Sequence, residues 1–347
     1  MTARKVAIIG DHFMLPAMFE RALAALPVPA IETRSLQLDW PDVPMRAGDT
    51  NDGDSGVSEY VGAPDEVARF IGDAEILINH LAPVTRAMLA HLPRLKFIVI
   101  TRGGPVNMDM RALAERAIGV ASTPGRNASA VAEFTVGLLL TQTRRISAGH
   151  EALRRGRWRG DLYRADSAGD ELADLTVGII GYGRIGNRLA RLLQPFNCRL
   201  LAADPHIDID DEAVKQVAQS VLLAESDVVV LAARVTAESI GLIGDAQLRR
   251  MKKTALLVNV ARGPLVDYAA LYDALAENRI GGAALDTFAI EPPPAGEPLL
   301  QLPNVTLTPH IAGASRRTIN IAAECAAEEV RRYLAGESPR NPVTLPS

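Results

Sequence analysis

The chain has 347 residues, a formal net charge of −4 at pH 7, 48% hydrophobic residues and 22% charged residues. This length exceeds one ordinary core and predicts two domains of a globular protein. The slightly acidic balance offers no electrostatic basis for binding nucleic acid or a membrane, and no apolar run approaches the length of a membrane span. No signal-peptide pattern opens the chain, and Cys198 and Cys325 lack metal-binding spacing. We therefore expect a cytoplasmic protein that binds no metal.

In the first third, short apolar runs alternate with helix-like segments. Such runs, bounded by Gly, Pro or Asn, are typical of strands buried on both faces of a parallel sheet. Strands are predicted at 5–10, 74–80, 95–104 and 119–123, and helices at 18–26 and 108–117. Residues 41–64 are rich in Asp, Gly and Pro and predict a surface loop, with a lid as the alternative.

A long apolar segment at 127–148 opens the second part of the chain. It predicts a helix buried in its own domain or against a partner chain. Strand and helix patterns alternate again after it, with strands predicted at "CRLLAADP", "SDVVVLAA", "ALLVNVARG", "GGAALDTF" and "NVTLTP". Two such blocks predict an α/β fold with two domains, the second doubly wound. A last helix is predicted at about 315–335.

Three glycines in the pattern G-x-G-x-x-G, Gly181, Gly183 and Gly186, lie between a predicted strand and an amphipathic helix. In this context Gly181 permits a tight turn, Gly183 lets a pyrophosphate approach the backbone, and Gly186 lets the helix pack close to the sheet. The helix N-terminus would then face the phosphates with its free N–H groups. The segment therefore predicts a dinucleotide site.

The identity of the dinucleotide is predicted from Asp204, which ends the next predicted strand. Asp204 follows Gly181 at about the separation of 20 residues that the motif expects. A carboxylate there accepts both ribose hydroxyls of NAD and would repel the 2′-phosphate of NADP. Residues 205–207 contain no arginine to receive that phosphate. We expect NAD as the cofactor, in preference to NADP.

Three polar residues, Arg262, Glu291 and His310, each follow a predicted strand. Ligands bind outside the carboxyl ends of the strands in an open α/β sheet, so these side chains can meet. A histidine is suited to take the hydroxyl proton of a 2-hydroxy acid near neutral pH, and a carboxylate beside it would orient the ring. A guanidinium can bind the substrate carboxylate bidentately.

The motifs "GYGRIGNRLA", "NVARGPLVD", "LDTFAIEPPP" and "TPHIAG" resemble those of the D-isomer-specific 2-hydroxyacid dehydrogenases, which include phosphoglycerate dehydrogenase-like and glyoxylate reductase-like enzymes. The resemblance extends over essentially the whole chain. It implies an NAD-dependent oxidoreductase that transfers a hydride between NAD(H) and C2 of a small D-2-hydroxy or 2-keto acid. In that family Arg262, Glu291 and His310 would form the catalytic triad. The implied cofactor contacts are Gly181, Gly183, Arg184, Ile185, Gly186, Asp204, Thr236, Val260, Asp286, His310 and Gly313, with Asp286 at the nicotinamide carboxamide.

The resemblance also implies two Rossmann-like domains. A flavodoxin-like, discontinuous substrate-binding domain would comprise residues 1–107 plus 315–347, and a doubly wound NAD-binding domain residues 108–314. The helix at about 127–148 would serve dimerisation, so a homodimer is expected. "TRGGPVNMD" resembles the family's substrate loop, which implies substrate contacts from Arg102, Gly103, Gly104 and Asn107 in addition to Arg262. Asn79 and His80 are further candidates for the cleft, although a structural role is favoured for His80.

The sequence departs from the family pattern at Ala232 and Arg234, which stand where His and Pro are usual. The segment 158–164 has no assigned role. One alternative is a formate or phosphite dehydrogenase of the same fold, but formate dehydrogenases usually carry glutamine at the position of Glu291. The other is a non-catalytic, NAD-sensing, corepressor-like protein, which the absence of long disordered extensions disfavours. Which hydroxy acid is the substrate is left open.

Overall fold

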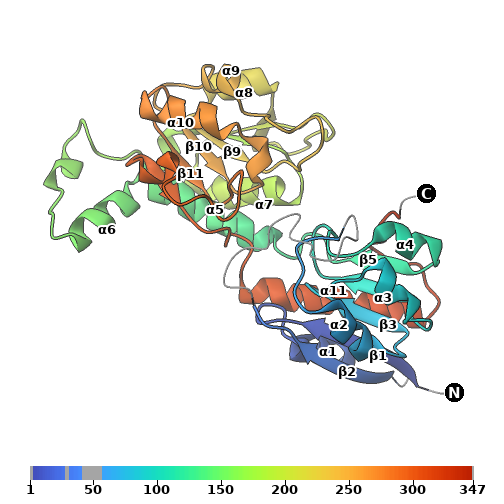
Figure 1. Cartoon of the computed structure of the whole chain (residues 1–347). Coiled ribbons are helices and arrows are strands. Elements are labelled where there is room, and N and C mark those ends of the chain that lie inside the picture. The colour runs from blue at the N-terminus through green and yellow to red at the C-terminus, as the bar shows by residue number, and fades with distance from the viewer. Residues whose placement is uncertain (1–2, 28–30, 41–56, 346–347) are drawn as a thin grey trace. The chain divides into compact units, whose positions relative to one another are not determined.

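The computed structural model describes residues 3–27, 31–40 and 57–345. The chain divides into two compact units, Met1–Arg126 with Ala314–Ser347, and Asn127–Gly313. Each unit contains a parallel sheet with helices packed on it, as predicted (Figure 1). The first unit is discontinuous in sequence, because the last helix of the chain packs on its sheet.

The first unit is built on a five-stranded sheet within its described residues, in the order β2-β1-β3-β4-β5. Its strands are β1 (Arg4–Gly10), β2 (Ile31–Gln37), β3 (Ile76–Asn79), β4 (Phe97–Ile100) and β5 (Gly119–Ser122). Its helices are α1 (Pro16–Ala24), α2 (Pro64–Ile71), α3 (Arg86–Ala90), α4 (Met110–Glu115) and α11 (Arg316–Leu334).

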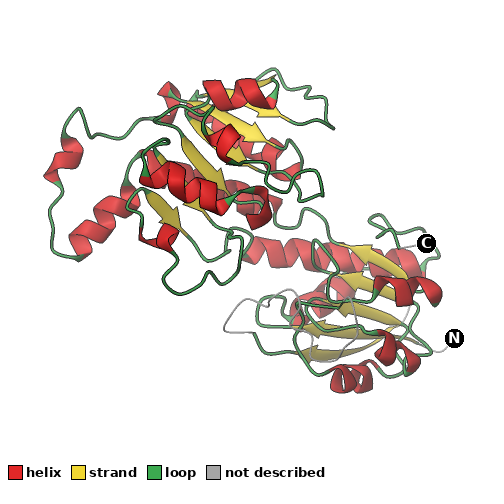
Figure 2. Cartoon of the chain, turned by 45° about the horizontal axis from the view of Figure 1, so that its top comes forward, coloured by secondary structure: helices red, strands yellow, loops and turns green. Residues whose placement is uncertain are grey.

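Helices cover both faces of this sheet (Figure 2). Successive side chains of a strand point to opposite faces. Val6 and Ile8 of β1 accordingly pack with α1 and α11, whereas Ala7 and Ile9 pack with α2, α3 and α4. The continuous apolar sequence of β1 follows from this two-sided burial.

The C-terminal segment is held to the first unit by polar contacts as well. The hydroxyl of Tyr333 in α11 donates to Glu75 Oε1 at 2.8 Å, and the backbone N–H of Ser122 donates to the carbonyl of Asn341 at 2.9 Å. Tyr333 stacks on Phe97 of β4 with ring centroids 4.8 Å apart. These contacts explain why a segment distant in sequence completes this unit.

The second unit is built on a seven-stranded sheet within its described residues, in the order β12-β11-β10-β9-β6-β7-β8. Its strands are β6 (Thr176–Ile180), β7 (Arg199–Ala203), β8 (Val214–Gln216), β9 (Val228–Leu231), β10 (Leu256–Asn259), β11 (Gly282–Leu285) and β12 (Val305–Leu307). Its α-helices are α5 (Ala128–Thr143), α6 (Ile146–Arg154), α7 (Arg184–Leu193), α8 (Gln219–Glu225), α9 (Asp245–Leu248) and α10 (Tyr268–Ala276). Short 3-10 helices occur at η1 (Gly160–Tyr163), η2 (Leu172–Asp174), η3 (Gln194–Phe196), η4 (Gly263–Leu265) and η5 (Pro298–Gln301).

Helices α5 and α7 pack on one face of the second sheet, and α8, α9 and α10 pack on the other. The side chain of Gln142 fixes α5 to the sheet, because its amide donates to the carbonyls of Ala283 and Asn304. Its carbonyl accepts a hydrogen bond from the Thr306 hydroxyl at 3.0 Å. Much of the apolar surface of α5 is therefore buried within its own unit.

The structure corrects several sequence-based expectations. The helix predicted at 127–148 ends at Thr143, and Arg145 adopts a left-handed conformation with φ of 54° before α6 begins. The predicted boundary at 107 is wrong because β5 pairs with β4 and keeps residues 108–126 in the first unit. Strands β2 and β8, which have exposed polar side chains, were not predicted. Residues 41–56 of the predicted surface loop lie outside the described residues.

Candidate active site

The glycine-rich loop between β6 and α7 has the geometry that the motif predicts. Gly181 has a φ of +94°, and a Cβ there would lie 2.6 Å from the nitrogen of Ala233. A Cβ on Gly186 would lie 2.1 Å from the carbonyl oxygen of Gly181, so the helix could not approach the turn as closely. A Cβ on Gly183 would meet nothing within 4 Å. Only the first and third glycines are thus required by the fold itself, whereas Gly183 leaves open space beside the backbone.

This open space lies at the N-terminus of α7, where Arg184 and Ile185 form the first helical turn. No side chain caps the helix at Gly183. Its first N–H groups and the positive end of the helix dipole suit a phosphate group. The residues present therefore fit the pyrophosphate of a dinucleotide.

Asp204 follows β7, and its carboxylate is hydrogen-bonded to the glycine-rich loop. Its Oδ2 accepts a hydrogen bond from the backbone N–H of Tyr182 at 2.8 Å, and its Oδ1 accepts one from His206 at 2.9 Å. Burial and a hydrogen bond to Asp211 raise the pKa of the Tyr182 hydroxyl to about 12. Asp204 is only half-buried, which leaves its carboxylate accessible to a ribose hydroxyl at the loop.

His310 and Glu291 form a hydrogen-bonded pair beyond the ends of β12 and β11. The imidazole Nδ1 lies 2.7 Å from Glu291 Oε2, and the His310 side chain is 41% exposed. Glu291 Oε1 accepts the backbone N–H of Phe288 at 3.0 Å. Burial acts to raise the pKa of Glu291, but the His310 contact, this N–H and the charge of Arg262 together lower it. The pair therefore holds an ionised carboxylate on one ring nitrogen and leaves Nε2 for a ligand.

Arg262 follows β10 and is exposed. Its loop is held by Asn259, the last residue of β10, whose Oδ1 accepts the N–H of Ala261 and whose amide donates to the carbonyl of Arg262 at 3.0 Å. The charge of Arg262 contributes to the lowered pKa of Glu291, and its Nη1 donates to the carbonyl of Ala261 at 2.7 Å. The structure thus places Arg262, Glu291 and His310 after the adjacent strands β10, β11 and β12 of one sheet. Asn259 was not predicted as a site residue, although an asparagine at the end of an apolar strand is recognisable in the sequence.

Asp286 is fully buried at the end of β11 and holds the loop that carries His310. Its Oδ1 accepts hydrogen bonds from the Thr308 hydroxyl at 2.6 Å and the Ile311 N–H at 2.9 Å. Its Oδ2 accepts the N–H of Ala312 at 2.9 Å. His310 itself has a φ of 53°, a left-handed conformation that is uncommon for residues other than glycine. Asp286 therefore fixes the backbone on either side of His310, and its predicted contact with the nicotinamide stays a prediction.

The other predicted cofactor residues lie in the loops of the same unit. Thr236 is exposed in a turn after β9, where its N–H donates to Ser239 at 2.7 Å. Val260 is buried between β10 and Arg262. Gly313 lies close to Asn127. A Cβ on Gly313 would lie 2.9 Å from the Asn127 amide nitrogen.

The predicted substrate residues follow β4 in the first unit. Gly103 and Gly104 are exposed, and a Cβ on either would meet nothing within 4 Å. Arg102 pairs with the side chain of Glu59 and donates to the Glu59 carbonyl at 2.8 Å. Asn107 is fully buried and donates to the carbonyls of His80 and Ala82. The two glycines thus present open backbone, whereas Asn107 secures the loop after β3.

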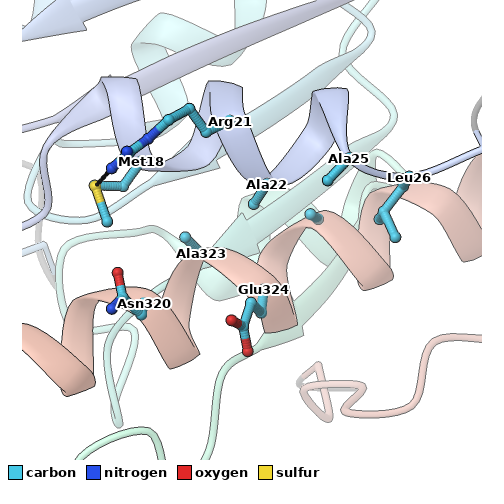
Figure 3. A pocket seen from close by; sticks show the side chains of 9 residues that line it. Met18, Arg21, Ala22, Ala25, Leu26, Asn320, Ala323 and Glu324 are labelled. Atoms are coloured by element: carbon cyan, nitrogen blue, oxygen red, sulfur yellow. Dashed lines mark hydrogen bonds between the residues drawn. The ribbon is translucent and has the colours of Figure 1, made fainter.

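A groove on the first unit, about 410 Å³ in volume, lies between α1 and α11 (Figure 3). It is lined by four alanines together with Met18, Arg21, Leu26, Asn320 and Glu324. No predicted site residue lines it, so it plays no part in the site described above. Among the described residues, no helix is both long and apolar enough to span a membrane.

Comparisons with known proteins agree with this geometry. The profile of the D-isomer specific 2-hydroxyacid dehydrogenase, NAD binding domain, matches residues 136–312. The putative 2-hydroxyacid dehydrogenase YoaD of Bacillus subtilis is 39% identical over 242 residues, 69% of this chain and 70% of that protein. The glyoxylate reductase of Korarchaeum cryptofilum is 38% identical over 275 residues, 78% of this chain and 83% of that protein. The structure of the TT0316 protein of Thermus thermophilus aligns with a TM-score of 0.78 and 29% identity, over 98% of this chain and 100% of that one.

Proposed function

The chain belongs to the D-isomer-specific 2-hydroxyacid dehydrogenase family, and from this premise we propose that Arg262, Glu291 and His310 catalyse its NAD-linked hydride transfer. The substrate is a small 2-hydroxy or 2-keto acid, and the reaction takes place at C2. The observation that carries the proposal is the hydrogen bond between His310 Nδ1 and Glu291 Oε2, and Arg262 follows the neighbouring strand of the same sheet. An intact triad does not exclude the alternative of a non-catalytic, NAD-sensing protein, and measurable turnover without a captured protein partner would dispose of it.

Each residue has a separate task in this proposal. His310 takes the hydroxyl proton at Nε2 during oxidation and returns it to the carbonyl oxygen during reduction. Glu291 holds the ring through Nδ1, so that Nε2 points to the substrate, and stabilises the charge that the ring acquires. Arg262 binds the substrate carboxylate and polarises the carbonyl. Bound NAD supplies the hydride acceptor.

The cofactor site is proposed to comprise the residues predicted from the motif. Gly183, Arg184 and Ile185 would contact the pyrophosphate at the N-terminus of α7. Asp204 would accept the ribose hydroxyls and oppose a 2′-phosphate, which favours NAD over NADP. In the first unit, the exposed backbone of Gly103 and Gly104 would donate N–H groups to the substrate carboxylate.

A homodimer is proposed on the basis of the segment that includes α6 and η1, which extends away from the rest of its unit (Figures 1 and 2). Ile146, Leu153, Trp158 and Tyr163 in this segment are between 54% and 96% exposed. Large apolar side chains gathered on one projecting segment indicate an interaction surface. Sedimentation of the wild-type chain tests this, and a monomer at all concentrations would contradict it. A cytoplasmic location is proposed from the two free cysteines.

The decisive experiment follows the absorbance of NADH with glyoxylate, pyruvate and hydroxypyruvate, and with formate and NAD in the reverse assay. We expect turnover with at least one keto acid and a preference for NADH over NADPH. Turnover with formate alone would instead support the formate dehydrogenase alternative. If no substrate is turned over while NADH still binds, the catalytic proposal fails.

A further inference from the structure

Tyr268, the first residue of α10, has a half-buried side chain whose hydroxyl group joins two loops of the second unit. The hydroxyl donates to the backbone carbonyl of Thr287, in the loop after β11. It also accepts from the side-chain amide of Asn259, the last residue of β10, over a long contact of 3.5 Å. Burial raises the pKa of this hydroxyl above its ordinary value of 10, and the charge of Glu291 adds to the effect. The group therefore keeps its proton and acts as a donor near neutral pH.

Asn259 links the Tyr268 hydroxyl to the loop that carries Arg262. Its amide nitrogen, which contacts Tyr268, also donates to the backbone carbonyl of Arg262 at 3.0 Å. An asparagine amide has two protons, one for each of these contacts. Its Oδ1 accepts the backbone N–H of Ala261 at 3.1 Å. One side chain thus ties the backbone around Arg262 to the hydroxyl.

The acceptor of the Tyr268 hydroxyl belongs to a peptide group that also holds Glu291. The carbonyl of Thr287 and the N–H of Phe288 are the two ends of one planar peptide unit. The carbonyl accepts from Tyr268, and the N–H donates to Glu291 Oε1 at 3.0 Å. The rings of Tyr268 and Phe288 also lie near each other, with centroids 6.5 Å apart. The orientation of this peptide group therefore connects Tyr268 to the carboxylate.

The loops after β10 and β11 are in direct backbone contact as well. Gly263 follows Arg262, and a Cβ on Gly263 would lie 1.8 Å from the carbonyl oxygen of Phe288. The backbone after Arg262 thus lies against the backbone that precedes Glu291. This contact limits how closely the loops approach, whereas the bond from Tyr268 fixes the direction of the peptide group between them.

We propose that Tyr268 is a positioning residue, whose hydroxyl aligns the 287–288 peptide group and through it the Glu291–His310 pair. Hydrogen bonds run without a break from Tyr268 through this peptide and Glu291 to Nδ1 of His310. Donation to the carbonyl polarises the peptide, which strengthens the bond from its N–H to the carboxylate. This inference rests on the proposed function, because it concerns the alignment of the same catalytic residues.

The test is Tyr268→Phe, which removes the hydroxyl and retains the ring. The assay follows NADH with whichever of glyoxylate, pyruvate and hydroxypyruvate the wild-type chain reduces fastest. We expect kcat to fall roughly tenfold with a smaller change in KM, because misalignment of the pair affects the transition state more than binding. Tyr272→Phe is the matched control and should leave kcat unchanged. Tyr272 lies one turn further along α10, is also half-buried, and makes no side-chain hydrogen bond within the described part of the chain.

A double-mutant cycle with Glu291→Gln separates positioning from general support of the fold. Because Tyr268 acts through Glu291, the two changes should not be additive. In the Glu291→Gln background, Tyr268→Phe should lower kcat by no more than about twofold. A tenfold loss in both backgrounds would overturn the inference.

Hydrogen exchange at the Phe288 amide provides a readout that is independent of turnover. The amide should exchange roughly tenfold faster in Tyr268→Phe than in the wild type or in Tyr272→Phe, because the peptide group has lost its fixed orientation. An unchanged exchange rate or an unchanged kcat in Tyr268→Phe would overturn the inference and leave the proposed function intact. The proposed function fails instead if His310→Gln retains the wild-type kcat.

Discussion

The loops after β3 and β10 are constructed in the same way in the two units, yet they present different chemistry. Asn79 and Asn259 each end a strand, are fully buried, and bond to the backbone two or three residues ahead. After Asn79 comes the buried His80, whereas the loop after Asn259 presents the exposed Arg262. The same pattern of local hydrogen bonds thus precedes a charged side chain that is exposed and a neutral ring that is enclosed by the fold.

Each unit also contains a buried carboxylate that supports a nearby loop. Asp11 in the first unit and Asp286 in the second are both 0% exposed, and each accepts two backbone N–H groups from a nearby loop. Asp286 supports the loop of His310, which stays exposed, whereas Asp11 bonds directly to its histidine. In the second unit the histidine beside the buried carboxylate is exposed, whereas in the first unit it is enclosed by the fold.

The largest expected effect is on catalysis in the second unit. His310→Gln should lower kcat by roughly 10²–10⁴-fold, because the proposed acid–base group is lost. NADH binding, measured by fluorescence titration, should stay nearly unchanged. His91→Gln, at an exposed position of the first unit, is the control. An undiminished kcat in the His310 variant would contradict the acid–base role proposed for His310.

Loss of either buried carboxylate should destabilise its own unit. Asp286→Ala leaves the Thr308 hydroxyl and two N–H groups without their acceptor, which should lower the free energy of unfolding by about 3 kcal/mol. Asp11→Ala should have a similar effect on the first unit. Denaturant titration combined with hydrogen exchange assigns each loss to a unit. If exchange protection falls equally in both units, the two carboxylates are not local supports.

Two glycines of the glycine-rich loop allow effects on stability and effects on ligand binding to be measured separately within one unit. Gly186→Ala should lower the free energy of unfolding by about 1–3 kcal/mol, because its Cβ would overlap the carbonyl oxygen of Gly181. Gly183→Ala should leave stability unchanged but weaken NADH binding, since its Cβ would enter only the open space. Thermal unfolding and NADH titration of the two variants measure this contrast. A stable Gly186→Ala variant would contradict the packing role assigned to that glycine.

The smallest effect concerns the dependence of stability on pH. Because the pKa of folded His80 lies below its ordinary value of 6.5, the unfolded chain binds more protons below that pH, and the first unit should lose stability as pH falls through it. The pKa of Glu291 is lowered from 4.5, so the stability that it contributes should be lost only at more acidic pH. Hydrogen exchange of each unit at pH 7 and pH 5 tests whether the first unit loses stability before the second as the pH falls. A second unit that loses protection first, or a His80→Gln variant with unchanged pH dependence, would contradict it.

Much of the fold was predictable because its strands are continuous apolar runs. Such runs identified β1, β3, β4 and β5, whereas β2 was missed because its exposed side chains are polar. The break after α5 was also missed, since the left-handed conformation of Arg145 has no sequence signal such as glycine. The boundary at Arg126 depended on the pairing of β5 with β4, a contact between segments that are distant in sequence.

The motifs alone predicted the chemistry of the second unit, because a dinucleotide loop needs glycines at fixed spacing and the three polar residues each follow a recognisable strand. Tertiary structure alone decided which side chains meet. Asp11 and His80 are separated in sequence by β2 and β3, and only the switch in strand order places them side by side. The partner of a buried polar group depends on sheet order rather than on its neighbours in sequence. The histidine to which local context assigned a structural role is therefore the partner of Asp11 in the folded chain.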